Sequence, residues 1–360
     1  IECNHRIEVD IRHPLLLHRG TDAVGFLAQK AAVNHVESSE CAGKTVSHPP
    51  NLMVYYRQSG GGCMSSGAPV RLDEASEWWM LDLEAYGTTG YGGVYVLDSS
   101  PPVMIDTGLG RNTEWICELL DGWGTDRGEP IAILITHIHL DHAGGVSQLC
   151  DAYPNAQVYV HRRGAPHLVE PERLIKGTKE AVGQMWRYYE APLPIGDDRI
   201  VIVGEDDQIE AGGHRFTVHA APGHAPHQVV YHDQETDFLF CGDAMGIRIP
   251  GTDRVIASTP PPQFDLEQSR EDVAMIAERR PARLCYAHYG HQPFNREVAD
   301  RYDRILQRFV DDVTEALQGQ SLEHVTDAVA AGYDTNDVWG AEKTRAEASL
   351  NVRGVAKMRR

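Results

Sequence analysis

The sequence of 360 residues lacks any long hydrophobic run. Its longest stretch of strongly apolar residues, 131–135, is far shorter than the roughly 20 residues that cross a bilayer. No N-terminal segment joins a basic start to an apolar stretch of signal-peptide length, because the short run 15–17 is followed at once by His18 and Arg19. The sequence therefore argues against a transmembrane or exported protein and predicts a cytoplasmic one without a membrane partner.

Closely spaced cysteines and lysines are also scarce. The seven cysteines include no C-x-x-C pair, and an odd number of unpaired thiols fits a reducing cytoplasm. Only six of the 33 basic residues are lysine, and 52 acidic residues leave a formal net charge of −19. Such an acidic protein repels polyanions, so we expect a small-molecule substrate and no nucleic-acid partner. The sequence leaves a homodimer open.

The composition changes near residue 63. Residues 1–63 hold three of the seven cysteines and five of the 18 histidines, and they show no helix or strand period. We expect this segment to be a disordered or non-native N-terminal extension, with a small irregular subdomain as the alternative. Residues 64–295 carry the motifs described below and are expected to form the catalytic domain. Residues 296–360 show helical spacing and are expected to form a helical C-terminal region.

Short apolar runs alternate with helix-like stretches from residue 64 onward. Strands are expected at 93–97, 103–105, 131–135, 157–160, 200–203, 216–219, 228–232 and 237–241. Helices are expected at 112–120, 145–152, 178–189 and 266–279. The glycine-rich segment 87–93 is interpreted as a turn before the first strand. Strands that alternate with helices indicate a layered α/β architecture.

The strongest chemical signal directly follows the expected strand 131–135. The segment 136–142 reads Thr-His-Ile-His-Leu-Asp-His, so four potential ligands lie within six residues: His137, His139, Asp141 and His142. Such a group at a strand end, where the chain turns and side chains can converge, is typical of metal binding. If the strand alternation continues, the first two histidines point the same way, and the other two residues can face a second ion. Surface histidines on a loop are the alternative interpretation.

Three more ligand-capable residues follow later strand-like runs. They are His224 in Ala-Pro-Gly-His, Asp243 in Phe-Cys-Gly-Asp and His288 in Tyr-Ala-His-Tyr-Gly. Successive strand ends gather on one rim of a layered fold, so these side chains are expected to meet the first group there. Each of the three alone could be structural, but together with 137–142 they predict one metal centre. His291 is a rival to His288.

The segment 137–142 matches an H-x-H-x-D-H motif, through which the chain resembles the metallo-β-lactamase superfamily from about residue 87 to 290. The segments 106–108, 223–224 and 242–243 extend the resemblance in the order that this superfamily uses. The resemblance implies a four-layer αβ/βα sandwich with a helical C-terminal appendage. It is strongest to the glyoxalase II and lactonase branch, in which C-terminal helices can wall the substrate cleft.

The resemblance also implies how the ligands divide between two ions. One ion would be held by His137, His139 and His224, and the second by Asp141, His142 and His288, with Asp243 bridging both. Two divalent ions, zinc first and iron or manganese as alternatives, would activate a bridging hydroxide at neutral pH. Asp141 would orient that hydroxide. Asp106 would fix a ligand or a neighbouring loop from behind.

Four further residues are candidates for contacts with a substrate. His227, three residues after His224, could donate a proton to the leaving group, with a structural hydrogen bond as the alternative. Arg162 and His167 leave a strand on the expected rim. Arg248 lies in the segment 246–264, which is expected to form a loop over the site. A solvated loop is the alternative for Arg162 and His167.

These features predict a binuclear-metal hydrolase that uses a metal-bridging hydroxide on a small ester, thioester or lactone. The alternative from another class is a mono-iron oxidoreductase resembling persulfide dioxygenases, with the iron at His137, His224 and Asp243. A phosphodiesterase or RNase of the same fold is a second alternative, which the acidic composition disfavours. Metal content separates the first two hypotheses. The hydrolase should hold two zinc ions per chain, whereas the oxidoreductase should hold a single iron and take up oxygen.

Overall fold

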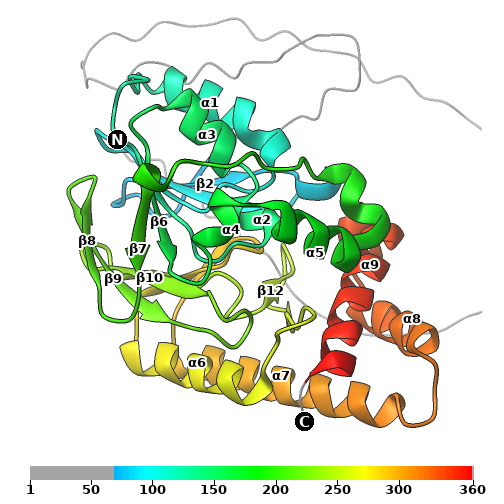
Figure 1. The fold of residues 1–360 in the computed structure, drawn as a ribbon. Helices are drawn as coiled ribbons and strands as arrows, with labels where there is room; N and C mark the ends of the chain where they lie inside the picture. Colours follow the sequence, from blue (N-terminus) through cyan, green and yellow to red (C-terminus); the bar gives the residue numbers. More distant parts are fainter. Residues whose placement is uncertain (1–68, 359–360) are drawn as a thin grey trace, which may run out of the picture. The chain divides into compact units, whose positions relative to one another are not determined.

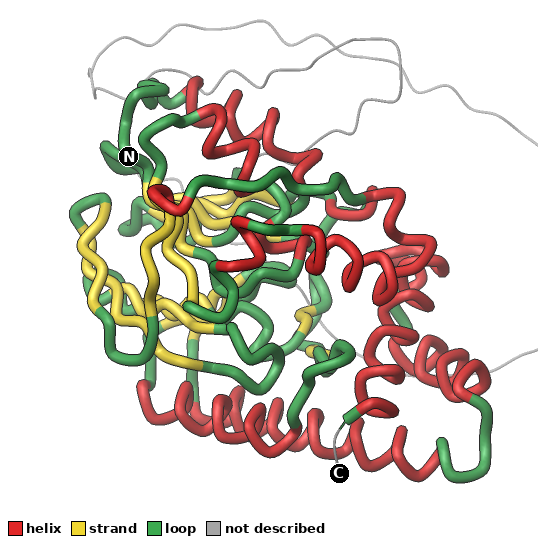
Figure 2. Tube along the Cα trace, in the orientation of Figure 1, coloured by secondary structure: helices red, strands yellow, loops and turns green. Residues whose placement is uncertain are grey.

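Two β-sheets packed face to face form the centre of the structure, a computed structural model that describes residues 69–358. The expected N-terminal extension, 1–63, lies outside the described residues. Figure 2 shows the strands between helices on two opposite sides. The structure thus has the expected four-layer αβ/βα arrangement, with the helical C-terminal region beside it (Figure 1).

The first sheet has seven strands in the order β1-β2-β3-β4-β5-β6-β7. Their bounds are Val70–Arg71, Trp78–Asp82, Gly93–Leu97, Val103–Ile105, Ala132–Leu134, Gln157–His161 and Ile200–Val203. Pairing is antiparallel from β1 to β4 and parallel from β4 to β7. The carboxyl ends of β4, β5 and β6 therefore meet at one edge of the sheet, where the segments after β4 and β5 carry Asp106 and the 136–142 motif.

The second sheet has six strands in the order β15-β14-β11-β10-β9-β8. In chain order, β8 to β11, β14 and β15 span Gln208–Ala211, His214–Ala220, Val229–Asp233, Phe238–Phe240, Arg283–Cys285 and His291–Pro293. Only the β11–β14 pair is parallel in this sheet. A separate hairpin, β12 (Ile247–Arg248) and β13 (Val255–Ile256), occupies part of the segment 246–264, which was expected to be an irregular loop.

The helices cover the outer faces of both sheets. On the first sheet lie α1 (Thr113–Gly122) and α3 (Val146–Ala152), and on the second lie α6 (Leu266–Arg279) and α7 (Arg296–Ala316). In β5, Ile133 packs with α1 and α3, while Leu134 packs between the sheets with Phe240. Because such a strand is buried on both faces, its sequence is a continuous apolar run instead of an alternating one.

The remaining helices lie around one end of the sandwich. They are α2 (Leu140–Ala143), α4 (Pro166–Val169), α5 (Glu172–Val182), α8 (Leu322–Tyr333) and α9 (Asn336–Lys357). Short 3₁₀ helices include η1 (Ala85–Gly87) and η3 (Gly183–Tyr188). Figure 1 shows α9 beside α5 and α8, and both neighbours contact it. None of the helices within 69–358 combines the length and apolarity that a bilayer span requires.

Two sequence-based expectations differ from the structure. The helix expected at 178–189 is instead α5, which ends at Val182, followed by η3 from Gly183. The helix ends there because Gly183 adopts a φ of 55°, outside the helical region. The glycine-rich segment 87–93 does not precede the first strand, because β1 and β2 come before it. It contributes to the turn that joins β2 to β3.

Candidate metal centre

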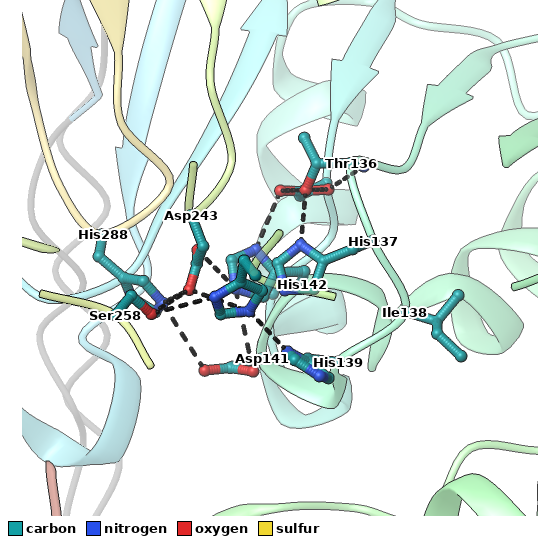
Figure 3. A network of polar contacts seen from close by, with 12 residues as sticks. Thr136, His137, Ile138, His139, Asp141, His142, Asp243, Ser258 and His288 are labelled. Atoms are coloured by element: carbon teal, nitrogen blue, oxygen red, sulfur yellow. Dashed lines mark hydrogen bonds and ion pairs between the residues drawn. The ribbon is translucent and has the colours of Figure 1, made fainter. Parts of the chain in front are cut away.

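The predicted ligand residues converge at the strand ends on one edge of the sandwich. His137 and His139 follow β5, and Asp141 and His142 lie in α2 directly after them. The other three come from the second half of the domain: His224 from the segment between β9 and β10, Asp243 from the end of β11, and His288 from the end of β14. Figure 3 shows six of the seven as labelled sticks, turned toward one another.

The ligand residues form three groups, and within each group the potential ligand atoms all lie within 4.8 Å of one another. The groups are His137–His139–His224, His137–His142–Asp243 and Asp141–His142–His288. The first and third coincide with the two triplets that the superfamily resemblance implied, and the second includes the aspartate expected to bridge them. His288, not His291, belongs to the cluster, because His291 lies in β15 with its Nδ1 2.7 Å from an Arg283 guanidinium nitrogen.

Asp243 is at the centre of the cluster. Its Oδ2 lies 3.3 Å from His288 Nε2 and 3.5 Å from His224 Nε2, and its Oδ1 lies 3.4 Å from His142 Nε2. The Ser258 hydroxyl donates to Asp243 Oδ2 at 2.9 Å. One carboxylate therefore joins histidines from both halves of the domain, the position that a bridging ligand requires.

Hydrogen-bonding partners of several rings fix which nitrogen of the histidine faces the cluster. His288 Nδ1 donates to the Tyr91 carbonyl at 3.3 Å, so its Nε2 faces the cluster. His137 Nδ1 lies 3.1 Å from Thr136 Oγ1, which itself donates to Asp106. His224 Nδ1 lies 3.3 Å from Ser258 Oγ. Such contacts set the tautomer and the orientation of metal-ligating imidazoles.

Unsatisfied buried atoms and neutral rings support a cation at this position. His137 Nε2 and Asp243 Oδ1 are buried without any hydrogen-bond partner, which is costly unless something else binds them. Burial lowers the pKa of His137 and His139 and brings the pKa of His224 to about 3. These three rings are therefore neutral at pH 7, the state in which imidazole binds a metal. The residues present thus fit a metal site, while the number and identity of ions stay a prediction.

Asp106 lies behind the cluster, as expected. Its side chain is buried and accepts from the Thr136 backbone N–H at 2.8 Å, and its Oδ2 lies 3.1 Å from His142 Nδ1. The carboxylate thereby orients the ring whose Nε2 faces Asp243. Asp106 does not line the cavity above the cluster, so its place is that of a supporting residue.

We predict that Asp106→Asn lowers metal affinity by about 10- to 100-fold without preventing folding. The reason is that the amide keeps the size of the side chain but removes the charge that holds His142 Nδ1–H. Metal titration of chelator-treated protein by calorimetry would measure the change, and wild-type affinity in the variant would contradict it.

Asp272 of α6 supports the segment that carries His224. Its Oδ2 accepts from the Gly223 backbone N–H at 2.7 Å, and a Cβ on Gly223 would lie only 2.2 Å from the Ser269 backbone nitrogen. Glycine is therefore required where the chain passes α6. Burial raises the pKa of Asp272 to about 7.

This raised pKa predicts a pH dependence of stability. Between about pH 4 and pH 7 the folded protein keeps the Asp272 proton that the unfolded chain has lost. The stabilisation is full below about pH 4 and is lost as the pH rises to 7, amounting to at most about 4 kcal/mol. Asp272→Asn should remove this decline, because its amide oxygen can still accept from Gly223. Denaturant unfolding at several pH values checks this, and parallel profiles for the two proteins would refute it.

A cavity of about 350 Å³ opens above the cluster. Five of the seven predicted ligands line it: His139, Asp141, His224, Asp243 and His288. Tyr86 also lines it, donating its hydroxyl to Asp141 Oδ2 at 3.2 Å and sharing a short hydrogen bond with Tyr189. Burial raises the pKa of both phenols, so they are neutral hydrogen-bonding groups at pH 7. The ligand cluster thus faces a cavity large enough for a small molecule.

The structure brings two of the four candidate substrate-contact residues to this cavity. His167 of α4 and His227 line it. Burial lowers the pKa of His227 to about 2, so its ring is neutral at pH 7, with Nδ1 3.5 Å from the Ile138 N–H. Proton donation by His227 stays a prediction, and the neutral ring has only its Nε2–H to offer.

Arg162 and Arg248 lie outside the cavity. Arg162 is exposed in the turn after β6. Arg248 lies in β12, and its guanidinium is directed to Gly290, where an added Cβ would lie 2.8 Å from Nη1. Its backbone N–H donates to the His288 carbonyl at 3.0 Å. Neither side chain is therefore placed to contact a substrate in the cavity; Arg248 instead helps to hold the segment that carries His288.

Several residues at the site were not predicted from the sequence. They are Tyr86, Tyr91, Tyr189 and Ser258 around the ligands, and Lys343 and Glu347 of α9 in the cavity wall. The aromatic residues beside glycines in 86–93 were the one available signal, because such a segment in a loop can present side chains to a site. The α9 residues gave no signal, since a lysine and a glutamate four apart resemble an exposed helical ion pair.

Comparison with known proteins identifies related sequences and folds. The sequence profile described as the metallo-beta-lactamase superfamily matches residues 87–288, more than half of the chain. A metallo-beta-lactamase fold-containing protein of Sulfurisphaera tokodaii is 29% identical over 163 residues, which cover 44% of this chain and 60% of that protein. A hydroxyacylglutathione hydrolase of Erwinia tasmaniensis is 31% identical over 185 residues, which cover 50% of this chain and 60% of the enzyme. The chain thus matches less than two thirds of the length of either relative.

Solved structures show the same fold. An archaeal metallo-beta-lactamase superfamily protein from Sulfolobus tokodaii superposes with a TM-score of 0.59 at 22% identity, covering 79% of this chain and 99% of that chain. A metallo-beta-lactamase family protein from Thermus thermophilus superposes with a TM-score of 0.53 at 17% identity, covering 74% of this chain and 87% of that chain. At these identities the likeness concerns the fold alone.

Proposed function

The chain belongs to the metallo-beta-lactamase superfamily, and from this premise we propose that it is a binuclear-metal hydrolase of a small ester, thioester or lactone. The observation that carries the proposal is the pair of ligand triplets joined by Asp243 beneath the cavity. The similarity to hydroxyacylglutathione hydrolases supports the reaction class.

The residues would divide the work of holding two ions. His137, His139 and His224 would hold one, Asp141, His142 and His288 the other, and Asp243 both. When bound, two divalent ions supply Lewis acidity and lower the pKa of a bound water to about 7. Zinc suits this set of imidazoles and carboxylates, with iron or manganese as alternatives.

The side chains around the ions would handle the proton and the orientation of the substrate. Asp141 is the ligand best placed to move a proton, because it lines the cavity and its carboxylate is 19% exposed, against 3% for Asp243. The Asp141 carboxylate would accept a proton from the attacking water and then pass it to the leaving oxygen or sulfur. The Tyr86 hydroxyl, bound to Asp141 Oδ2, would hold the carboxylate in place. His227 would contribute a hydrogen bond from Nε2–H to the substrate.

The test is a substrate panel with matched metal analysis. Purified protein would be loaded with zinc, iron or manganese, its metal content measured by mass spectrometry, and ester, thioester, lactone and phosphodiester turnover assayed together with oxygen uptake. We expect two ions per chain and turnover of an acyl substrate. One iron per chain with oxygen uptake, or turnover of phosphodiesters alone, would overturn the proposal.

A further inference from the structure

The cavity extends from the metal cluster into an apolar part between α5 and α9. On the α5 side it is lined by Leu174, Val182 and Met185, the last from η3, and on the α9 side by Ala346 and Leu350. Pro260 to Pro262 line it as well. The space above the ligands thus has a polar end at the cluster and an apolar end at the helices.

The apolar side chains of helix α5 face this space and pack only partly against the core. It is strongly amphipathic in sequence, yet none of its residues is fully buried. Leu174 and Val182 both line the cavity and are only half-buried. An amphipathic helix normally buries its apolar face against a core. Here that face borders a cavity, which is the arrangement expected where an apolar ligand completes the packing.

Two of the charged groups near the apolar end are paired with each other. Lys343 and Glu347 are both buried, and Lys343 Nζ lies 2.6 Å from Glu347 Oε2. Arg173, which also lines the cavity, has an exposed side chain at the start of α5. The side chains of Val182 and Leu350 offer a charged group no partner, so its burial beside them is strongly unfavourable.

We propose that the apolar end of this cavity binds an unbranched hydrocarbon acyl chain of the substrate, with its carbonyl at the metal cluster. This inference rests on the proposed function and deepens it by naming the substrate class: fatty-acyl esters or thioesters of medium length. It distinguishes the chain from enzymes whose acyl group is small and polar, because a hydroxyacyl group would leave the α5 and α9 side chains facing water. The apolar wall then contributes to catalysis by binding, since each buried methylene strengthens binding by a similar amount.

The first measurement is chain-length dependence. Aryl esters from acetyl to decanoyl, and lactoyl and octanoyl thioesters of one small thiol, would be assayed with the zinc-loaded full chain. We expect kcat/KM to rise by up to about fourfold per added methylene until the cavity is full. The octanoyl thioester should be preferred over the lactoyl thioester. A flat series, or a preference for the lactoyl thioester, would overturn the acyl-chain site.

Two variants that fill the apolar end test its location. Ala346→Trp places a large side chain in the cavity from α9, and Gly177→Phe does so from α5, where an added Cβ would meet no atom within 4 Å. Both should move the optimum to shorter chains, so that decanoyl ester turnover falls by more than acetyl ester turnover. Ala356→Trp is the matched control, because Ala356 is exposed on α9 outside the cavity and should keep the wild-type chain-length profile. Unchanged profiles in both cavity variants would overturn the inference.

Binding of decanoate to the chelator-treated protein, followed by calorimetry, separates this inference from the proposed function. If decanoate binds to wild type and Ala356→Trp but not to Ala346→Trp, the acyl-chain site stands even if no ester is hydrolysed. If esters of all lengths are hydrolysed alike and decanoate does not bind, the hydrolase stands and the acyl-chain site is refuted.

Discussion

Asp243→Asn is expected to lose bound metal and to reduce kcat/KM by more than the roughly 10- to 100-fold typical of residues that only support a ligand. The amide has almost the same shape as the carboxylate, but it cannot bring a negative charge within 3.3–3.5 Å of His142, His224 and His288. Without that negative charge between them, two divalent cations would repel each other strongly. Metal content per chain and initial rates on the best substrate measure the effect.

Asp272→Asn is the control for Asp243→Asn. It makes the same substitution at another buried aspartate, one that holds the Gly223 backbone and lies outside the ligand groups. This control should keep its metal and its turnover. If Asp243→Asn also kept both at wild-type values, the central position given to Asp243 would be wrong.

Glu347→Ala is expected to destabilise the protein by about 3–5 kcal/mol, the cost of leaving a buried charge without its partner. Glu347 is 2% exposed and accepts from Lys343 Nζ at 2.6 Å, from the Tyr91 hydroxyl at 2.6 Å and from Asn351 Nδ2 at 3.2 Å. The ammonium of Lys343 also lies 3.6 Å from the centre of the Tyr91 ring. Removing the carboxylate therefore leaves the Lys343 ammonium and the Tyr91 hydroxyl without their buried acceptor. Denaturant unfolding of the metal-free protein measures the loss.

Arg345→Ala is the matched comparison on the same helix. Arg345 pairs with Asp327 at 2.7 Å, but both side chains are at least half exposed, so its loss should cost no more than about 1 kcal/mol. Equal effects of the two substitutions would show that the buried contacts of Glu347 stabilise the protein no more than an exposed ion pair does. Because the Tyr91 ring also packs on His288, with centroids 4.7 Å apart, Glu347→Ala should in addition weaken metal binding.

The ligand cluster could be predicted from the sequence because most of its members follow strands that are buried on both faces. Such strands appear as short apolar runs, and ligand-type residues directly after them are easily recognised. The bounds of α6 were predictable for a local reason. Asp265 caps its first turn by accepting from the Gln268 N–H, and Arg280 ends it in the left-handed conformation.

The cavity walls could not be predicted in the same way. Whether Lys343 and Glu347 face solvent or a buried site depends on how α9 packs against the β2–β3 turn, which the local spacing does not specify. Tyr86 reaches Asp141 because its backbone adopts a φ of 63°, rare for a residue with a side chain. A strand was missed at β2, where two tryptophans and two other apolar residues precede Asp82. In each case tertiary packing, not local sequence, decides the outcome.

The most direct test of the account is an anomalous-scattering map from crystals grown with zinc and measured at the zinc absorption edge. The account predicts two peaks roughly 3.5–4 Å apart, one about 2.0–2.1 Å from nitrogens of His137, His139 and His224. The other peak should lie among Asp141, His142 and His288, with Asp243 in contact with both. An ordered cluster without a peak, or zinc bound only elsewhere on the chain, would contradict it.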